Sequence, residues 1–399
     1  MIVKQALFRG GQWVKEATLS AACQGMDSSK TLVLAYASAD LPIDTIRQVL
    51  AEIRGLLPLS TIVACSTAGE IMGSRVYLDS IVVGIIRFEH SRFIADSQPV
   101  AAPESSFDAG SALAAALAAP DLRAILIHSD GLGVNGSALA KGLVSGLNSK
   151  SGDATPPVTV SGGLAGDAAR FQATWTYLSK PHQTDVSEIG PGNVVAIGFS
   201  GQRLAVSTGS VGGWDRFGHP KTITRSTGNV VYEIDGAPAL DLYRRYLGEL
   251  ASELPASALL FPLELQNDGN QPTVVRTILS INEADKSLTF AGDVPEGRRA
   301  QLMRANFENI IGGAAQSGAQ AIEALRQARG PLLAIAISCV GRRLVLGSRT
   351  EDETEALANK LPPGSWIQGF YSYGELSPVG TTGCELHNQT MTVTLLREN

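Results

Sequence analysis

Three near-continuous apolar runs early in the chain constrain its fold most strongly. They read TLVLAY at residues 31–36, TIVAC at 61–65 and SIVVGIIRF at 80–88. Runs of this length without polar alternation are typical of strands buried on both faces of a sheet. Between the first two runs, apolar residues recur at helical spacing over residues 43–56. This strand–helix–strand order predicts a βαβ unit with a right-handed crossover.

The segments that follow predict a mixed sheet rather than a purely parallel one. Helices are expected over the alanine-rich residues 106–119 and again up to about Leu147, with a buried strand at 123–128 between them. Further strands are expected close together, near residues 157–161, 171–178, 193–199 and 203–209. The alternating run LAVSTG in the last of these indicates antiparallel pairing. The predicted fold class is therefore α/β, of mixed α+β character.

The length of the chain, 399 residues, predicts two domains, because a single core usually stops growing below this size. The clearest turn-forming stretch is GGWDRFGHP at residues 212–220. After it come expected strands at 229–234, 273–281 and 287–291, expected helices at 238–251 and 306–327, and apolar runs near the end of the chain. We expect two packed domains, residues 1–218 and 219–399, each a mixed β-sheet flanked by helices.

Composition excludes several classes of protein. The formal net charge of −6 argues against a nucleic-acid binder, which usually carries a basic face. The apolar runs fall far short of the roughly 20 residues that span a bilayer, and the N-terminus lacks the apolar stretch of a signal peptide. The four cysteines are scattered, without a CxxC pair, which argues against a disulfide scaffold or a four-thiolate zinc site. A cytoplasmic protein without membrane insertion is expected.

The stretch CSTAGE at residues 65–70 directly follows an expected buried strand. The backbone N–H groups of Cys65, Ser66 and Thr67 could cradle an anion or a carboxylate, particularly at a helix N-terminus. A tight turn lined by small residues explains the same pattern. A third interpretation, Cys65 as a nucleophile, requires a neighbouring base.

Two glycine-rich stretches follow other strands. GLGVNG at residues 131–136 matches the GxGxxG pattern of dinucleotide-binding turns, with Asp153 as the downstream acid, although a structural turn with a helix cap explains it as well. In SGGLAGD at 161–167, Gly162 and Gly163 could let the backbone approach a ligand. Ser161 lacks the GxSxG elbow of an α/β-hydrolase.

The last part of the chain gathers polar residues at the ends of apolar runs. Arg342 and Glu375 each follow such a run, and His387, Asn388 and Thr390 precede the final one. We expect these five side chains to surround one cavity, which binds a ligand rather than catalysing a reaction.

The histidines show no spacing typical of a metal pair, and there is no HExxH motif. Cys384 and His387 form CxxH without a second pair of ligands. A non-covalently bound haem, however, needs only one axial histidine, which leaves no spacing pattern. His387 and His219 are the best placed, because each lies in a polar or glycine-rich break beside an expected strand.

Several of these stretches jointly resemble the FIST domain. They are CSTAGEI at 65–71, GGLAGD at 162–167, GNVVYEIDGAPAL at 228–240, SCVGR at 338–342, GFYSYGE at 369–375 and LHNQT at 386–390. The resemblance extends over nearly the whole chain, as an N-terminal and a C-terminal FIST half in the usual order. It implies a sensory protein that binds a small ligand, and not an enzyme.

Within that family, the chain resembles the nitric-oxide-sensing haemoproteins of the NosP type. The resemblance implies haem b, held by His387 or alternatively His219, with Tyr371 and Tyr373 lining its pocket. It also implies a partner histidine kinase or cyclic-di-GMP enzyme, since no effector domain is recognised here; a homo-oligomer stays open. The alternative is a FIST protein that senses a small polar metabolite, such as an amino acid, through Arg342, Glu375 and Asn388, without haem.

Overall fold

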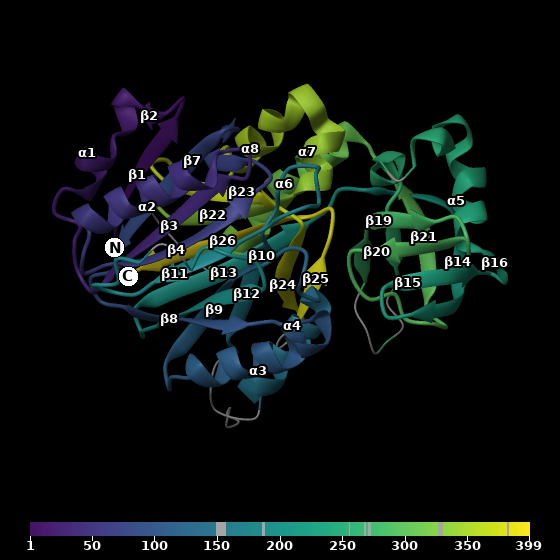
Figure 1. The fold of residues 1–399 in the computed structure, drawn as a ribbon, viewed down its shortest axis with the longest axis horizontal. Coiled ribbons are helices and arrows are strands. Elements are labelled where there is room, and N and C mark those ends of the chain that lie inside the picture. Colours follow the sequence, from purple (N-terminus) through teal and green to yellow (C-terminus); the bar gives the residue numbers. More distant parts are fainter. Residues whose placement is uncertain are drawn as a thin grey trace.

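The computed structural model describes residues 1–148, 157–185, 188–254, 256–266, 269, 273–325, 330–380 and 383–399. The chain forms a larger domain with three six-stranded sheets and a smaller domain with one eight-stranded sheet (Figure 1). The predicted mixed α/β class and the two-domain organisation are confirmed. No helix in the described ranges is both long and apolar enough to cross a membrane.

The first sheet has the order β11-β4-β3-β7-β1-β2, and its only parallel pair among the described residues is β3–β4. The strands are β1 (Ile2–Arg9), β2 (Gln12–Trp13), β3 (Thr31–Ser38), β4 (Thr61–Thr67), β7 (Ser80–Arg87) and β11 (Thr176–Ser179). Helices α1 (Leu19–Cys23) and α2 (Ile43–Leu56) belong to this part of the chain.

The second sheet has the order β25-β24-β10-β9-β12-β8 and a parallel β9–β10 pair. Its strands are β8 (Arg92–Pro99), β9 (Leu122–Ser129), β10 (Thr159–Leu164), β12 (Asn193–Ser200), β24 (Gly374–Val379) and β25 (Gly383–His387). Two helices that pack on each other, α3 (Ser106–Ala116) and α4 (Gly136–Asn148), lie on this side of the molecule (Figure 1).

The third sheet has the order β13-β26-β22-β23-β5-β6 and a parallel β22–β23 pair. Its strands are β5 (Glu70–Met72), β6 (Arg75–Tyr77), β13 (Leu204–Val211), β22 (Leu333–Cys339), β23 (Trp366–Ser372) and β26 (Met391–Glu398). Its helices are α6 (Phe307–Ala324), α7 (Val340–Leu346) and α8 (Thr350–Ala358).

The three sheets repeat one topology. In each, a central parallel pair is followed on one side by two antiparallel strands, which are β7 and β1, β12 and β8, or β26 and β13. On the other side each sheet is completed by a strand that comes from a different unit. β5 follows β4 but pairs with β23; β24 follows β23 but pairs with β10; β11 follows β10 but pairs with β4. The larger domain is therefore a threefold repeat whose units exchange edge strands.

Residues from the three sheets meet in a shared core. Tyr36 of β3, His128 of β9 and Phe370 of β23 contact one another there, with ring centroids 4.9–6.1 Å apart. The Tyr36 hydroxyl lies 3.3 Å from Nε2 of His128. Burial lowers the pKa of His128 to about 3, so its ring is neutral. This aromatic cluster ties the three sheets together, because each sheet contributes one ring.

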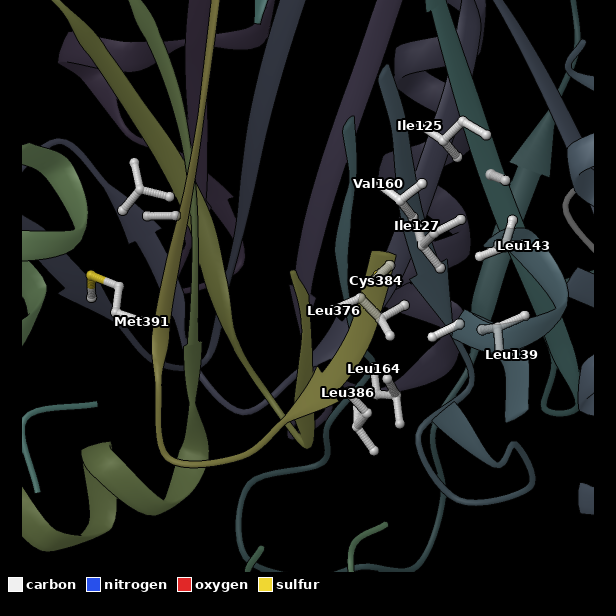
Figure 2. Close-up of a cluster of buried hydrophobic side chains, with 14 of the residues drawn as sticks. Ile125, Ile127, Leu139, Leu143, Val160, Leu164, Leu376, Cys384, Leu386 and Met391 are labelled. Atoms are coloured by element: carbon white, nitrogen blue, oxygen red, sulfur yellow. The ribbon is translucent and has the colours of Figure 1, made fainter. Parts of the chain in front are cut away.

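Another part of the core lies between α4 and the second sheet. In Figure 2, Leu139 and Leu143 of α4 lie close to Ile127 of β9, Leu164 of β10 and Leu386 of β25. Burying each of these side chains is worth about 1.5–3 kcal/mol. The exchanged hairpin β24–β25 is thereby fixed against residues from the middle of the chain.

The predicted helix at residues 43–56 is confirmed with the same bounds as α2. Its apolar positions Ile46, Val49, Leu50 and Ile53 are all buried against the sheet, as the 3.6-residue period requires. The helix starts directly after its N-cap Pro42, whose φ of −57° and ψ of 136° are non-helical, as is usual at that position. The expected helix at 106–119 is shorter, because α3 ends at Ala116.

The smaller domain is inserted between β13 and α6. Its order is β18-β17-β21-β14-β15-β20-β19, with β16 paired to β15, and all pairs described are antiparallel. The strands are β14 (Asp215–Thr227), β15 (Val230–Ile234), β16 (Ala237–Pro238), β17 (Leu263–Leu265), β18 (Val274–Arg276), β19 (Ile278–Asn282), β20 (Ser287–Phe290) and β21 (Arg299–Arg304). Helix α5 (Ala239–Leu247) covers its core (Figure 1).

The expected boundary between residues 218 and 219 falls inside β14. After β21 the chain returns to the larger domain at α6, and β26 then pairs with β13. The order of segments in the sequence does not reveal this insertion, because strands on both sides of the smaller domain pair in one sheet.

A buried ion pair fixes both connections to the smaller domain. The Arg342 guanidinium donates to the Glu353 carboxylate at 2.7 and 2.9 Å, and both side chains are fully buried. It also donates to the carbonyls of Gly212, just before the insertion, and of Ile310, just after it, at 2.8 Å to the latter. Glu353 is further held by the Tyr371 hydroxyl at 2.7 Å. One cation thus contacts the chain on both sides of the insertion. We call these two segments, residue 212 and the start of α6, the linkers.

Two buried glutamates occupy equivalent places at the start of the exchanged strands β5 and β24, in the third and second sheets. Glu70 accepts hydrogen bonds from Thr67 and Ser80, and Glu375 accepts them from Ser372 and Thr390. In each case one hydroxyl lies three residues earlier and the other lies at or just before the start of the last strand of the unit. Burial raises the pKa of each carboxyl to about 8, despite these hydrogen bonds.

Replacing Glu353 by Gln should lower the free energy of unfolding by about 3–5 kcal/mol, because it leaves the buried Arg342 charge without its counterion. Urea denaturation measures this. The matched control is Glu308→Gln, which removes an exposed ion pair with Arg349 and should cost less than about 1 kcal/mol. Equal costs for the two variants would contradict the structural role of the Arg342–Glu353 pair.

Stability should fall as the pH rises above about 4.5, because Glu70 and Glu375 bind a proton more tightly in the folded protein than in the unfolded one. The loss continues up to a pH of about 8. Between about pH 5 and pH 7, Glu375→Gln should reduce the slope of unfolding free energy against pH by about 1.4 kcal/mol per pH unit.

The control for this slope is Glu283→Gln. Lys286 and Arg244 lower the pKa of Glu283, so its contribution changes in more acidic solution. Its slope above about pH 5 should match that of the unmodified protein. A Glu375→Gln slope that also matches would show that Glu375 is ionised in the folded protein at neutral pH.

Candidate functional site

The two domains border a cavity of about 460 Å³. The larger domain contributes residues between 131 and 138, which run from the loop before α4 into that helix. It also contributes Leu164, Phe171 and Tyr373. The smaller domain contributes Leu279 and two segments, residues 228–229 and 290–293. A cavity of about 490 Å³ lies beyond it, also lined from both domains, and shares Phe171 and Leu279 with it. We call the two together the interdomain cleft.

The wall of the cleft at residues 131–136 is the GLGVNG stretch. Its backbone amides have partners within the chain: Gly131 donates to Thr174 and Gly133 to Asp130, each at 2.9 Å. Asn135 Oδ1 accepts from the Ala138 amide at 3.0 Å, as a cap of α4. This matches the structural turn with a helix cap, since these amides are not available to a phosphate. Asp153 lies outside the described residues.

A short loop after β10 presents Phe171 to the cleft. The Asp167 carboxylate accepts the backbone amides of Phe171, Gln172 and Ala173 at 2.8–2.9 Å, and the Tyr373 hydroxyl donates to it. Phe171 and Ala168 have φ values of 52° and 61°, which residues other than glycine rarely adopt. The loop is therefore held in a strained conformation by one carboxylate.

Tyr373 is the predicted site residue that lines the cleft. Its ring stacks on Phe171, with centroids 4.4 Å apart and planes 16° apart. Its position follows from the strand exchange, because it lies where the chain leaves β23 and enters β24. Burial raises the pKa of its hydroxyl, so Tyr373 stays neutral and donates to Asp167.

The predicted residues in β4 and β10 are packed inside the larger domain. Cys65 is fully buried, and burial raises the pKa of its thiol well above the ordinary value. Ser66 accepts the Trp175 amide at 3.1 Å, and Thr67 donates to Glu70 at 2.5 Å. Gly162 and Gly163 allow close packing: a Cβ on Gly163 would lie 2.6 Å from Ile337.

The five polar residues expected around one cavity form a packed cluster instead. Thr390 donates to Glu375 at 2.8 Å, and Asn388 donates to the Tyr373 carbonyl at 3.3 Å. Arg342 contacts the Gln389 carbonyl at 3.4 Å besides its ion pair. These residues and His387 do not line either cavity of the interdomain cleft. Buried polar groups must find partners, and Arg342, Glu375 and Thr390 find theirs within the protein.

The turn after β25 nevertheless keeps several buried polar atoms without partners. They are Nε2 of His387, Oδ1 of Asn388 and both amide atoms of Gln389, within the described part of the chain. Gln389 has a φ of 64°, and its carbonyl accepts the Trp214 indole N–H at 2.8 Å. Such atoms are rare in folded proteins and mark places where a water or a polar ligand can bind.

The four residues predicted to bind haem lie apart. His219 is exposed on β14, and the Tyr371 hydroxyl is taken by Glu353. Burial lowers the pKa of His387 to about 4, with a contribution from Arg276, which leaves a neutral ring with an unpartnered Nε2. That nitrogen suits an axial ligand, but no described cavity of haem size opens beside it. The residues therefore do not fit a bound haem in this arrangement.

Most residues that line the cleft outside the GLGVNG stretch carry no sequence signal, among them Phe171, Leu279 and Asp293. Leu132, Phe171 and Leu279 are large apolar side chains that are 37–41% exposed. Exposure cannot be read from sequence, so no pattern identified Phe171 or Leu279. The GLGVNG stretch was the one available signal, because it lies next to the cleft.

Known proteins resemble this chain at the level of family and, weakly, of fold. No curated protein matches it. Among solved structures, a cyanuric acid hydrolase from A. caulinodans is 11% identical, with a TM-score of 0.36, covering 100% of this chain and 99% of that one. A second cyanuric acid hydrolase structure is 11% identical, with a TM-score of 0.31 and full coverage of both chains. These scores are too low to support an argument about the fold.

The family comparison is decisive. The FIST N domain matches residues 31–237, and the FIST C domain matches residues 239–378. FIST domains are small-ligand sensory domains of signalling proteins. The chain belongs to the FIST domain family.

Proposed function

We propose that this protein is a sensor whose small ligand binds in the interdomain cleft. The observation that carries the proposal is a cavity of about 460 Å³ lined by both domains, a size typical of ligand sites. Exposed Leu132, Phe171 and Leu279 give it apolar walls, which a monomeric domain would otherwise bury. A ligand there contacts both domains at once.

Such a ligand would act through the arrangement of the two domains. A ligand shifts an equilibrium between two arrangements by as much as its affinity for them differs. The chain passes between the domains twice, through the linkers that Arg342 holds. The change would then reach a partner protein, for which the family resemblance favours a histidine kinase or a cyclic-di-GMP enzyme.

We also propose that the protein is not an enzyme. A nucleophilic cysteine needs a lowered pKa and an accessible thiol. Cys65 is fully buried with a raised pKa, and Ser66 beside it is hydrogen-bonded to the backbone. This opposes the nucleophilic interpretation of the CSTAGE stretch.

A haem-based nitric oxide sensor is the second candidate function. One observation favours it, the neutral His387 ring with a buried and unpartnered Nε2. Haem binding would require the region around β25 to open, because no described cavity of the needed size adjoins His387. His219 is the weaker alternative, since it is exposed.

The Leu279→Arg variant tests the cleft as the ligand site. A thermal-shift screen with a metabolite library, amino acids included, should find a ligand that raises stability by mass action, by about 2.7 kcal/mol at 100 times its Kd. Leu279→Arg places a long charged side chain at the cleft and should abolish that shift. The control Leu56→Arg alters an equally exposed leucine on α2 and should retain it. A shift that survives in Leu279→Arg would place the ligand elsewhere.

Absorbance spectra test the haem candidate. Protein produced with added haem precursor should show a Soret band that moves when nitric oxide is added. The band should disappear in His387→Ala and persist in His219→Ala. A colourless protein that also refuses haem on reconstitution would exclude this candidate and leave the cleft proposal untouched.

A further inference from the structure

The cleft contains an aromatic surface that its own loop does not require. One face of Phe171 is covered by Tyr373, yet the side chain remains 37% exposed and borders both cavities of the cleft. A bulky residue with a positive φ is a true outlier, worth roughly 1–3 kcal/mol of strain. Asp167 and Tyr373 together hold this conformation. Strain of this kind persists only where the surrounding structure enforces it, and it is enriched at ligand sites.

The charged side chains that line the cavity itself are acidic, and Lys141 lies beside one of them. The charged lining residues of the cavity, in the described part of the chain, are Glu104 and Asp293. The Asp293 carboxylate accepts from the side-chain amide of Asn135 at 3.2 Å and lies 3.3 Å from the Lys141 ammonium. Its side chain is 25% exposed to solvent. Its two carboxylate oxygens can accept further hydrogen bonds. No arginine or lysine among the described lining residues is available to bind an anion.

We infer that the ligand of the cleft is a small planar aromatic molecule with an amino group or another cationic nitrogen. Its ring stacks on the exposed side of Phe171, and its nitrogen donates to Asp293 and Glu104. This inference rests on the proposed function, since it names the class of ligand for the same cleft. The acidic lining disfavours carboxylate and phosphate ligands, because their charge would be desolvated beside two carboxylates.

Three probes separate the ring from the charge. Tryptamine carries both, indole-3-acetate carries the same ring with a negative charge, and 2-cyclohexylethylamine carries the amine without an aromatic ring. Equilibrium dialysis of the full-length protein at millimolar probe concentration measures each affinity. Tryptamine should bind about tenfold more tightly than indole-3-acetate, and about threefold to tenfold more tightly than the cyclohexyl amine.

Two variants assign these preferences to residues. Phe171→Leu should remove the preference for the ring and keep the preference for the amine, whereas Asp293→Asn should do the reverse. The matched controls are Phe107→Leu, an exposed phenylalanine on α3, and Asp121→Asn, an ion-paired aspartate with the same 25% exposure. Both controls should bind all three probes like the unmodified protein. Phe171→Tyr should keep the ring preference, which guards against loss of binding through misfolding.

Each outcome decides the inference. Equal or tighter binding of indole-3-acetate, no measurable tryptamine binding, or a tryptamine affinity unchanged by both Phe171→Leu and Asp293→Asn would overturn it. If the library ligand is anionic but still lost in Leu279→Arg, the ligand class is wrong and the cleft stands. If binding of every ligand survives Leu279→Arg, the proposed site itself fails.

Discussion

The exchange of edge strands between three similar units is the constraint on which the rest of the structure depends. A parallel pair of strands leaves both of its outer edges open to pairing, and an open edge is a liability for a soluble domain. Here each unit closes the edge of another, so no sheet is complete with the strands of its own unit alone. The candidate site follows directly from this arrangement. The crossing from β23 to β24 carries Tyr373 from the third sheet to the second, beside the loop that holds Phe171.

Two buried acids, Glu353 and Asp167, fix different parts of the interdomain cleft. Glu353 neutralises Arg342 and thereby fixes both linkers to the smaller domain, which sets the distance between the walls. Asp167 organises one wall, because a single carboxylate satisfies three backbone amides and the Tyr373 hydroxyl. A buried ion pair costs desolvation energy that its attraction hardly repays, so its value lies in fixing one geometry. Here that geometry is the position of an inserted domain.

Local patterns in the sequence predicted the local structure well. The helix at 43–56 and the strands beginning at Thr31, Thr61 and Ser80 follow from periodicity and runs of apolar residues, which depend on neighbours in the sequence. The stretch GFYSYGE at 369–375 shows the opposite case. The chain bends after Ser372, and the residues that follow pair with a different sheet. Pairing partners far apart in the chain leave no local pattern, and neither does an insertion between two strands of one sheet.

The same contrast between local sequence patterns and long-range contacts applies to the candidate functional site. Polar residues at strand ends, such as Arg342 and Glu375, were predicted to bind a ligand because such positions are common in binding sites. In the folded chain Arg342 pairs with Glu353 and Glu375 accepts from Thr390, while apolar Phe171 and Leu279 line the cleft.

The polar cluster still has a direct connection with the cleft. Asn388 donates to the carbonyl of Tyr373, and the neighbouring Gln389 carbonyl accepts from both Trp214 and Arg342 at the linkers. A ligand that moved the Tyr373–Phe171 pair would therefore act on the turn at residues 387–390, where buried polar atoms remain unpartnered among the described residues. These hydrogen bonds form a contiguous path from the wall of the cleft to the chain segments beside the smaller domain.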